Sequence, residues 1–126
     1  MTLRCVVVDD NDQLLGTASE LLHSQGMLVV GVATTSAEAE LLVETLKPDV
    51  VLVDVILGEE SGFDLVRRLA ARTDRGHPPA ILMSTHDEVE FADLVAMSPA
   101  IGFLSKSDLS AISIRELLDQ VRGADP

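Results

Sequence analysis

Five short apolar runs, each followed by a polar turn and a segment with helical spacing, limit what this chain can fold into. The runs cover residues 3–8, 27–32, 50–54, 80–83 and 101–104. Unbroken runs of branched aliphatic side chains are typical of strands buried on both faces. Strands that alternate with helices form a parallel sheet, and right-handed crossovers place the helices on both faces. We therefore predict an α/β sandwich with a five-stranded parallel sheet, although several doubly wound topologies fit at this point.

The segments between the runs carry signals for helix starts. Residues 35–38 and 85–88 have the pattern of a capping box, in which the first and fourth side chains satisfy free amides at a helix start. Ser110 is predicted to cap a last helix, and the tail 123–126 is predicted to fray. Residues 58–62, which include two glycines, are predicted to form a loop.

The length and charge of the chain restrict its domain organisation and its partners. With 126 residues, 47% of them hydrophobic, the chain is long enough for one domain with a core of its own and too short for two ordinary domains, so we predict a single domain over residues 1–126. A net charge of −12 disfavours binding to nucleic acid or to an anionic membrane surface, because both would repel the chain. The expected partners are proteins with basic or apolar contact surfaces.

The single cysteine and the lack of a long apolar stretch predict the compartment. Cys5 has no second cysteine with which to form a disulfide, which fits a reducing environment. No segment approaches the roughly 20 apolar residues of a membrane span, and the first apolar run is too short for a signal peptide. We expect a soluble, cytoplasmic protein in which Cys5 is a small core residue.

Reactive side chains follow four of the five predicted strands. Asp9 and Asp10 end the first strand, Asp54 the third, Ser84 the fourth and Lys106 the fifth. In an open parallel sheet, ligands bind beyond the carboxyl ends of the strands, so these residues are expected to meet in space. Three carboxylates at one edge repel one another, and Mg²⁺, a hard cation that prefers oxygen ligands, would neutralise them.

This set of residues fits phosphoryl transfer to Asp54. A carboxylate can accept a phosphoryl group, and a metal ion, a lysine and a hydroxyl around it supply the positioning and charge neutralisation that the transfer needs. Taken singly, the other acids and the serine are explained as helix caps, and the lysine as a solvated surface charge. Their common position at strand ends favours a shared site, because independent caps and surface charges do not require it.

The chain resembles the receiver domain of two-component response regulators over residues 3–122, in its single-domain, chemotaxis-like form. The resemblance rests on Asp9-Asp10, Asp54, the 57–62 loop, Ser84 and the run Phe103-Leu104-Ser105-Lys106, together with their spacing. It implies a flavodoxin-like (βα)5 fold with sheet order 2-1-3-4-5. It also implies that Asp54 accepts a phosphoryl group from a histidine kinase or a phosphotransfer protein.

The resemblance also assigns roles to individual residues. Phe103 would follow a movement of Ser84 toward the phosphoryl group, and phosphorylation would thereby reshape the face formed by the fourth helix, the fifth strand and the fifth helix. That face is the expected contact for an output partner or for a second copy of the chain. The assigned ligands are, for Mg²⁺, Asp9 (directly or through water), Asp10, Asp54 and the Ile56 carbonyl, and, for the phosphoryl oxygens, Ser84 and Lys106.

Three positions depart from the common pattern of that family, and one of them is Thr85, where receivers often have a small residue. Many receivers have proline after the leucine of the loop and after the lysine, where this chain has Gly58 and Ser107. Ser107 leaves open whether the preceding peptide bond is cis, since cis bonds are largely a proline phenomenon. Phe103 has no hydroxyl, so a switch that uses it must work through packing.

We interpret the chain as a phosphorylation-dependent switch and not as a multiple-turnover enzyme, although it can lose the phosphoryl group by its own hydrolysis. It can act through a protein partner, pass the group on in a relay, or form the receiver part of a longer DNA-binding regulator. The alternative is a phosphorylation-independent interaction module with the same fold. A phosphatase is disfavoured because the position two residues beyond Asp54 is Ile56 and not aspartate. A nucleotide-binding domain is disfavoured because no glycine-rich loop follows the first strand.

Overall fold

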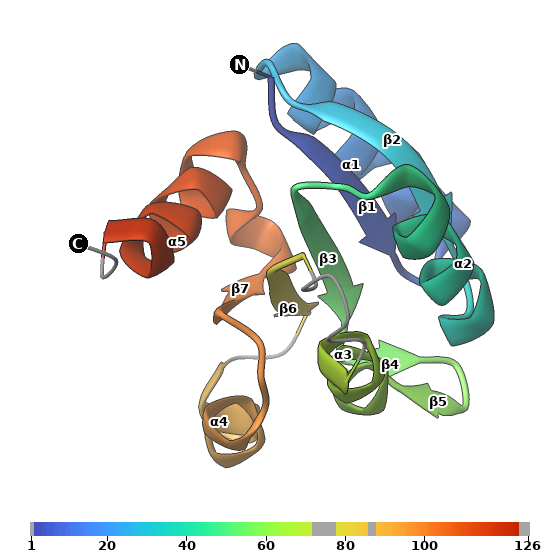
Figure 1. Ribbon diagram of the computed structural model, residues 1–126, viewed down its shortest axis with the longest axis vertical. Helices are drawn as coiled ribbons and strands as arrows, with labels where there is room; N and C mark the ends of the chain where they lie inside the picture. The colour runs from blue at the N-terminus through green and yellow to red at the C-terminus, as the bar shows by residue number, and fades with distance from the viewer. Residues whose placement is uncertain (1, 72–77, 86–87, 124–126) are drawn as a thin grey trace.

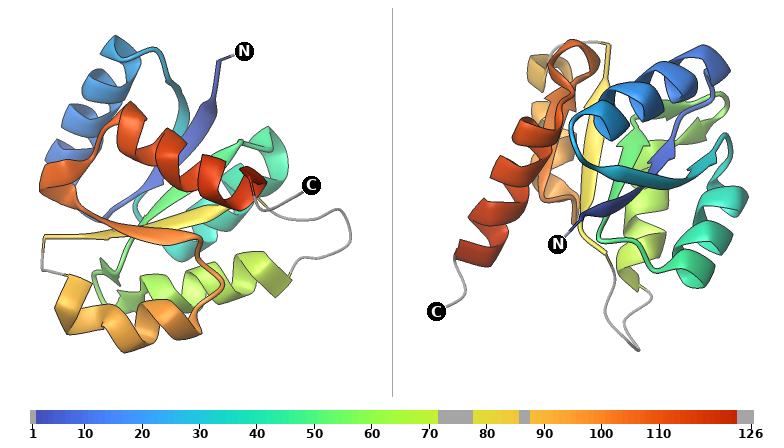
Figure 2. Two further views of the ribbon diagram at one scale, coloured as in Figure 1. Left: turned by 90° about the vertical axis from the view of Figure 1, so that its left-hand side faces the viewer. Right: turned by 90° about the horizontal axis from the view of Figure 1, so that it is seen from above.

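Every strand of the central sheet runs in the same direction, and helices cover both of its faces (Figures 1 and 2). The computed structural model describes residues 2–71, 78–85 and 88–123. The strands are β1 (Arg4–Val8), β2 (Leu28–Ala33), β3 (Val50–Asp54), β6 (Ala80–Ser84) and β7 (Gly102–Ser105), in the spatial order β2-β1-β3-β6-β7. The predicted flavodoxin-like order 2-1-3-4-5 is therefore confirmed.

Side chains of the strands alternate between two cores, one on each face of the sheet. Val50 and Leu52 of β3 lie in the core under α1 (Asp12–Ser24) and α5 (Ala111–Gly123). Val51 and Val53 lie in the core under α2 (Ser36–Leu46), α3 (Gly62–Ala71) and α4 (Glu88–Met97). Because all four side chains are fully buried, each contributes about 1.5–3 kcal/mol of hydrophobic stabilisation. This double burial explains why the strands read as unbroken apolar runs.

Two of the predicted helix caps are present, and a third contact comes from a distant element. The Glu38 amide donates to Thr35 Oγ1 at 3.2 Å, and the Glu38 carboxylate accepts from the Thr34 amide at 3.1 Å, one residue earlier than in the usual capping box. Ser110 accepts from the Ser113 amide at 3.0 Å at the start of α5. The Ala111 amide donates to the Gln25 side chain, which follows α1, at 2.7 Å. The second capping box and the tail lie partly outside the described residues.

The loop predicted at residues 58–62 is in part a hairpin, so that prediction was wrong in detail. β4 (Ile56–Leu57) pairs with β5 (Glu60–Ser61) in antiparallel register, and Gly58 in the turn has φ of 60°. A glycine with positive φ is what a two-residue hairpin turn requires. The peptide bond before Ser107 is trans, as are all others between described residues.

Gly62, at the start of α3, packs directly on the backbone of Asp54. A Cβ atom at position 62 would lie 2.0 Å from the Asp54 carbonyl oxygen. No side chain fits at that distance, so any other residue must displace either α3 or the end of β3. The Gly62 amide also donates to the Val55 carbonyl at 2.7 Å, which holds the two segments together.

We predict that Gly62→Ala lowers the free energy of unfolding by about 1–3 kcal/mol, because the new methyl group overpacks the end of β3. Urea denaturation monitored by circular dichroism would measure the change. Gly16→Ala is the matched control, since a Cβ at position 16 meets nothing within 4 Å in helix α1. That change should leave the stability unaltered or raise it by about 0.5–1 kcal/mol. Equal stability of Gly62→Ala and the parent protein would contradict the close approach.

Cys5 is predicted to be unreactive in the folded protein. Its side chain is completely buried in β1, and this burial raises the pKa of the thiol to about 12. Since the thiolate is the reactive species, a disulfide reagent such as DTNB at pH 8 should label the chain only after urea unfolds it. Rapid labelling without urea would show that the first strand is accessible.

Candidate functional site

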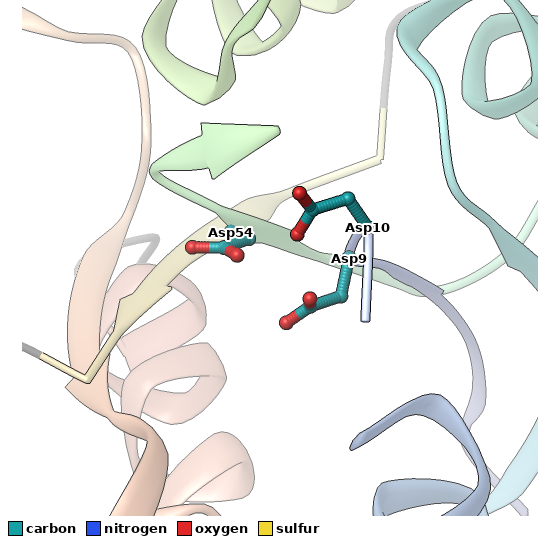
Figure 3. Close-up of side chains that lie close together, drawn as sticks. All are labelled: Asp9, Asp10 and Asp54. Carbon is teal, nitrogen blue, oxygen red and sulfur yellow. The ribbon is translucent and has the colours of Figure 1, made fainter. Parts of the chain in front are cut away.

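Three acidic side chains meet where β1 and β3 end. The two strands are neighbours and run in parallel, with Val8 opposite Val53, so the residues that follow Val8 reach the same edge as Asp54. Asp9, Asp10 and Asp54 each place one carboxylate oxygen within 4.8 Å of the other two (Figure 3). The predicted convergence of these three residues is therefore confirmed.

The local fold after β1 holds Asp9 in place. Asp9 is fully buried, its amide donates to the Ala33 carbonyl at 3.0 Å, and its Oδ1 accepts from the Asn11 amide at 2.9 Å. Asn11 in turn caps α1, because its side chain accepts from the amides of Gln13 and Leu14. Asp10 lies between these anchored residues and is exposed to solvent. One acid of the pair is therefore fixed in the interior, while the other joins the cluster from a position that solvent reaches.

Among the residues that the structure describes, only Lys106 forms an ion pair with the acidic cluster. It begins the short 3₁₀ turn η1 (Lys106–Asp108) that follows β7. Its Nζ lies 2.6 Å from Asp9 Oδ2 and 3.1 Å from Asp54 Oδ2, and its side chain is only 12% exposed. The lysine predicted at the end of the fifth strand therefore bridges acids from the ends of β1 and β3.

The surroundings of Asp54 change its affinity for protons. Asp54 is 6% exposed, and its Oδ1 accepts from the Ile56 amide at 3.2 Å. Burial raises the pKa of Asp54, the hydrogen bond from Lys106 opposes this rise, and the charge of Asp9 adds to it. For Lys106 burial alone would lower the pKa, but hydrogen bonds and charges from Asp9 and Asp54 outweigh it and raise the pKa.

The donor set of the cluster fits a divalent cation. Three carboxylates face one ammonium group, so the cluster has an excess of negative charge in a site where two of the acids are buried. Hard oxygen ligands at this spacing are those that Mg²⁺ binds, usually through one or two carboxylates and several waters. The acidic triad is consistent with the metal site of a receiver domain.

Ser84 and Phe103 lie on neighbouring strands beside this edge. Ser84 is the last residue of β6, is 2% exposed and pairs with Ser105 of β7, while Met83 pairs with Asp54. Phe103 is partly buried and packs against the core under α2, α3 and α4. Paired residues of a parallel sheet point to the same face, so Ser84 and Phe103 share a face. Their predicted roles in holding the phosphoryl group and in switching remain predictions.

Comparison with known proteins assigns the family. The family model of the response regulator receiver domain matches residues 5–122. The chain belongs to this family. The acidic pocket formed by Asp9, Asp10 and Asp54, with Lys106 bound to it, is consistent with phosphoacceptor signalling.

Individual relatives agree with this assignment. The response regulator GacA of Pseudomonas protegens is 30% identical over 123 residues, which cover 95% of this chain and 54% of that protein. The solved receiver domain of NarL from Mycobacterium tuberculosis has a TM-score of 0.78 at 28% identity, over 97% of this receiver and 98% of the other. The receiver domain of RstA from Klebsiella pneumoniae, solved in a BeF3-activated form, has a TM-score of 0.75 at 25% identity, over 91% and 95%.

The chain spans about half the length of the first curated relatives it matches. The described elements all belong to the receiver fold. None of the helices in the described part of this receiver is long and apolar enough to cross a membrane.

We predict that Asp54→Asn raises the melting temperature of the metal-free receiver at pH 7. Burial raises the pKa of Asp54 above its ordinary value of 3.8, so the folded state favours the protonated form. The stabilisation that protonated Asp54 gives the folded state is fully present below the unfolded pKa of 3.8. It is lost as the pH rises through the higher pKa of Asp54 in the folded state. The amide removes the penalty of a buried charge, and its advantage should therefore shrink as the pH falls toward 4.

Asp64→Asn is the matched control for this measurement. Asp64 is 58% exposed and pairs with Arg67 on the surface of α3, where an ion pair contributes little. Thermal melts in EDTA should show a small change for this variant. A melting temperature of Asp54→Asn below that of the parent receiver at pH 7 would contradict an unfavourable burial of the Asp54 charge.

Proposed function

We propose that Asp54 accepts a phosphoryl group from a histidine kinase or a phosphotransfer protein. The observation that carries the proposal is the convergence of a buried acceptor carboxylate, two further acids and a lysine at one edge of the sheet. Membership of the receiver family implies a kinase phosphodonor. In the transfer, a bond forms between an Asp54 oxygen and phosphorus as the phosphorus–nitrogen bond of the donor histidine breaks, and the imidazole takes up a proton.

Each side chain of the site has a task in this reaction. Asp9, Asp10, Asp54 and the backbone carbonyl of Ile56 would hold Mg²⁺, which neutralises charge on the phosphoryl oxygens when bound. Lys106 already donates to Asp54 and would donate to a phosphoryl oxygen after transfer. Ser84, at the end of β6, would supply a hydroxyl to another oxygen. Because Lys106 is held by Asp9 as well, it stays at the site when Asp54 is modified.

The proposed output is a change in the surface formed by α4, β7 and α5. Ser84 would move toward the phosphoryl group, and Phe103, on the same face of the sheet, would repack behind it. Apolar side chains are already exposed on the two helices, with Met97 78% exposed and Ile112 70% exposed. Such side chains suit an apolar contact with an output partner or with a second copy of the receiver.

We also propose that residues 1–126 form one receiver unit, whether it works alone, in a relay or as part of a longer regulator. It acts as a switch whose phosphorylated state persists or decays, not as a multiple-turnover enzyme. Its net charge of −12 disfavours binding of this unit to nucleic acid. The single cysteine favours a cytoplasmic location, because Cys5 has no second cysteine with which to form a disulfide.

The decisive experiment is labelling with a small phosphodonor. Acetyl phosphate with Mg²⁺ should add one phosphoryl group to the receiver, detected by intact-protein mass spectrometry. Asp54→Asn should abolish the labelling, EDTA should suppress it, and Asp64→Asn should leave it intact. Labelling that persists in Asp54→Asn would overturn the assignment of the acceptor. Failure of the parent receiver to be labelled by acetyl phosphate or by any kinase would favour the phosphorylation-independent interaction module.

A further inference from the structure

The β4–β5 hairpin lies next to the acceptor residue but is too small to hold its own shape. Ile56 follows Asp54 by two residues and donates its amide to Asp54 Oδ1. Only two residue pairs join the two strands of the hairpin, beyond the end of β3 and beside α3 (Figure 1). A two-stranded hairpin of this size is not stable alone in water, so contacts with the rest of the domain must fix its position.

The strand β4 and the base of the hairpin are fixed by burial and by local hydrogen bonds. Leu57 is 2% exposed and packs in the core under α2 and α3. The Gly62 amide donates to the Val55 carbonyl at 2.7 Å, and the Phe63 amide donates to Ser61 Oγ at 3.2 Å. These contacts hold the two ends of the hairpin, but they do not involve its turn.

The strand β5, directly after the turn, is held by a different part of the chain through Glu60. Its Oε1 accepts from the Ser36 amide at 3.0 Å. Ser36 is the first residue of α2 and is 2% exposed, and an amide in the first turn of a helix has no partner within that helix. A carboxylate at a helix start is also favoured by the helix dipole. The contact therefore satisfies a buried amide on one side and anchors the hairpin on the other.

The hydrogen bond between Glu60 and Ser36 can affect the acidic cluster because the turn of the hairpin lies beside Asp10. Gly58 lies so close to Asp10 that a Cβ atom at position 58 would be 3.7 Å from Asp10 Oδ2. Ile56 and Gly58 belong to the same short hairpin as Glu60, so a shift of Glu60 away from Ser36 would change the spacing between the hairpin and Asp10. By contrast the side chain of Glu59, in the turn before Glu60, makes no hydrogen bond or ion pair with any described residue.

We propose that Glu60 is a positioning residue that sets the affinity of the site for Mg²⁺. Its hydrogen bond to the Ser36 amide holds the hairpin at the spacing from Asp10 at which the Ile56 backbone and the acidic side chains bind one ion. This inference rests on the proposed function of the acidic cluster. Because coupling between two sites is reciprocal, binding of Mg²⁺ also strengthens the contact between Glu60 and Ser36, and the start of α2 responds to the metal.

The test compares three variants in the full chain. Glu60→Ala removes the acceptor, and Glu60→Gln keeps an acceptor oxygen without the charge. Glu59→Ala removes an equal charge from the adjacent residue without breaking the contact. Calorimetric titration with MgCl₂ measures the affinity, and hydrogen exchange of the Ser36 amide with and without Mg²⁺ measures the coupling. We expect Glu60→Ala to weaken Mg²⁺ binding about tenfold relative to Glu59→Ala, since residues that orient metal ligands change affinity by about 10–100-fold.

Glu60→Gln should bind Mg²⁺ as Glu59→Ala does, and Mg²⁺ should slow exchange at Ser36 in the parent receiver but not in Glu60→Ala. Equal affinity of Glu60→Ala and Glu59→Ala would overturn the proposal, as would a Glu60→Gln variant as weak as Glu60→Ala. Thermal melts show whether each variant is folded; if Glu60→Ala is not, a parent receiver in which Mg²⁺ does not slow exchange at Ser36 would still overturn the proposal. Neither readout uses phosphoryl transfer, so failure of acetyl phosphate labelling would be seen separately.

Discussion

The structure depends on how one lysine is shared between two buried acids. Lys106 Nζ lies within ion-pair distance of both Asp9 and Asp54, and it reaches them from the far side of β6. Without it, two buried carboxylates at adjacent strand ends would have no cation within ion-pair distance among the described residues, and burying such charges unpaired is strongly unfavourable. The contact therefore connects β7 to the ends of β1 and β3 through charge, beyond the hydrogen bonds of the sheet.

The same arrangement leaves the site incompletely neutralised. One ammonium group faces three carboxylates, and the raised pKa of Asp54 reflects its burial. Natural sites of this kind trade stability for function, because groups that are unfavourable in the free protein become favourable when a ligand binds. A bound divalent cation would neutralise the excess charge of the acids and the further negative charge of a transferred phosphoryl group, so the residues that destabilise the edge are also those that suit it to signalling.

The sequence was sufficient to predict the strands, the sheet order implied by the family resemblance, and the positions of Asp54 and Lys106. These features have strong local signals, since strands buried on both faces appear as unbroken apolar runs and the reactive residues come directly after them. The β4–β5 hairpin was missed because two-residue strands have no periodicity, although the glycine followed by one polar residue in its turn was an available signal.

Contacts between distant side chains and helix starts could not be predicted at all. Glu60 accepts from Ser36 and Gln25 accepts from Ala111, pairs that are separated by 24 and 86 residues. Each acceptor is an ordinary polar residue in its own segment, and only the packing of the helices on the sheet brings it to a free amide. The capping box at Thr35, by contrast, is local and was found directly.

The close packing of Gly62 on the Asp54 carbonyl has a consequence for engineering. The segment between β3 and α3 is short and its turn residues, Gly58 and Glu59, are exposed, so it can be exchanged as a unit. An exchanged segment should end before residue 62, because any side chain larger than that of glycine at this position would collide with the Asp54 carbonyl oxygen. A transplanted segment that ends at Ser61 leaves that peptide undisturbed, whereas one that carries its own residue into position 62 would alter the acceptor together with the loop.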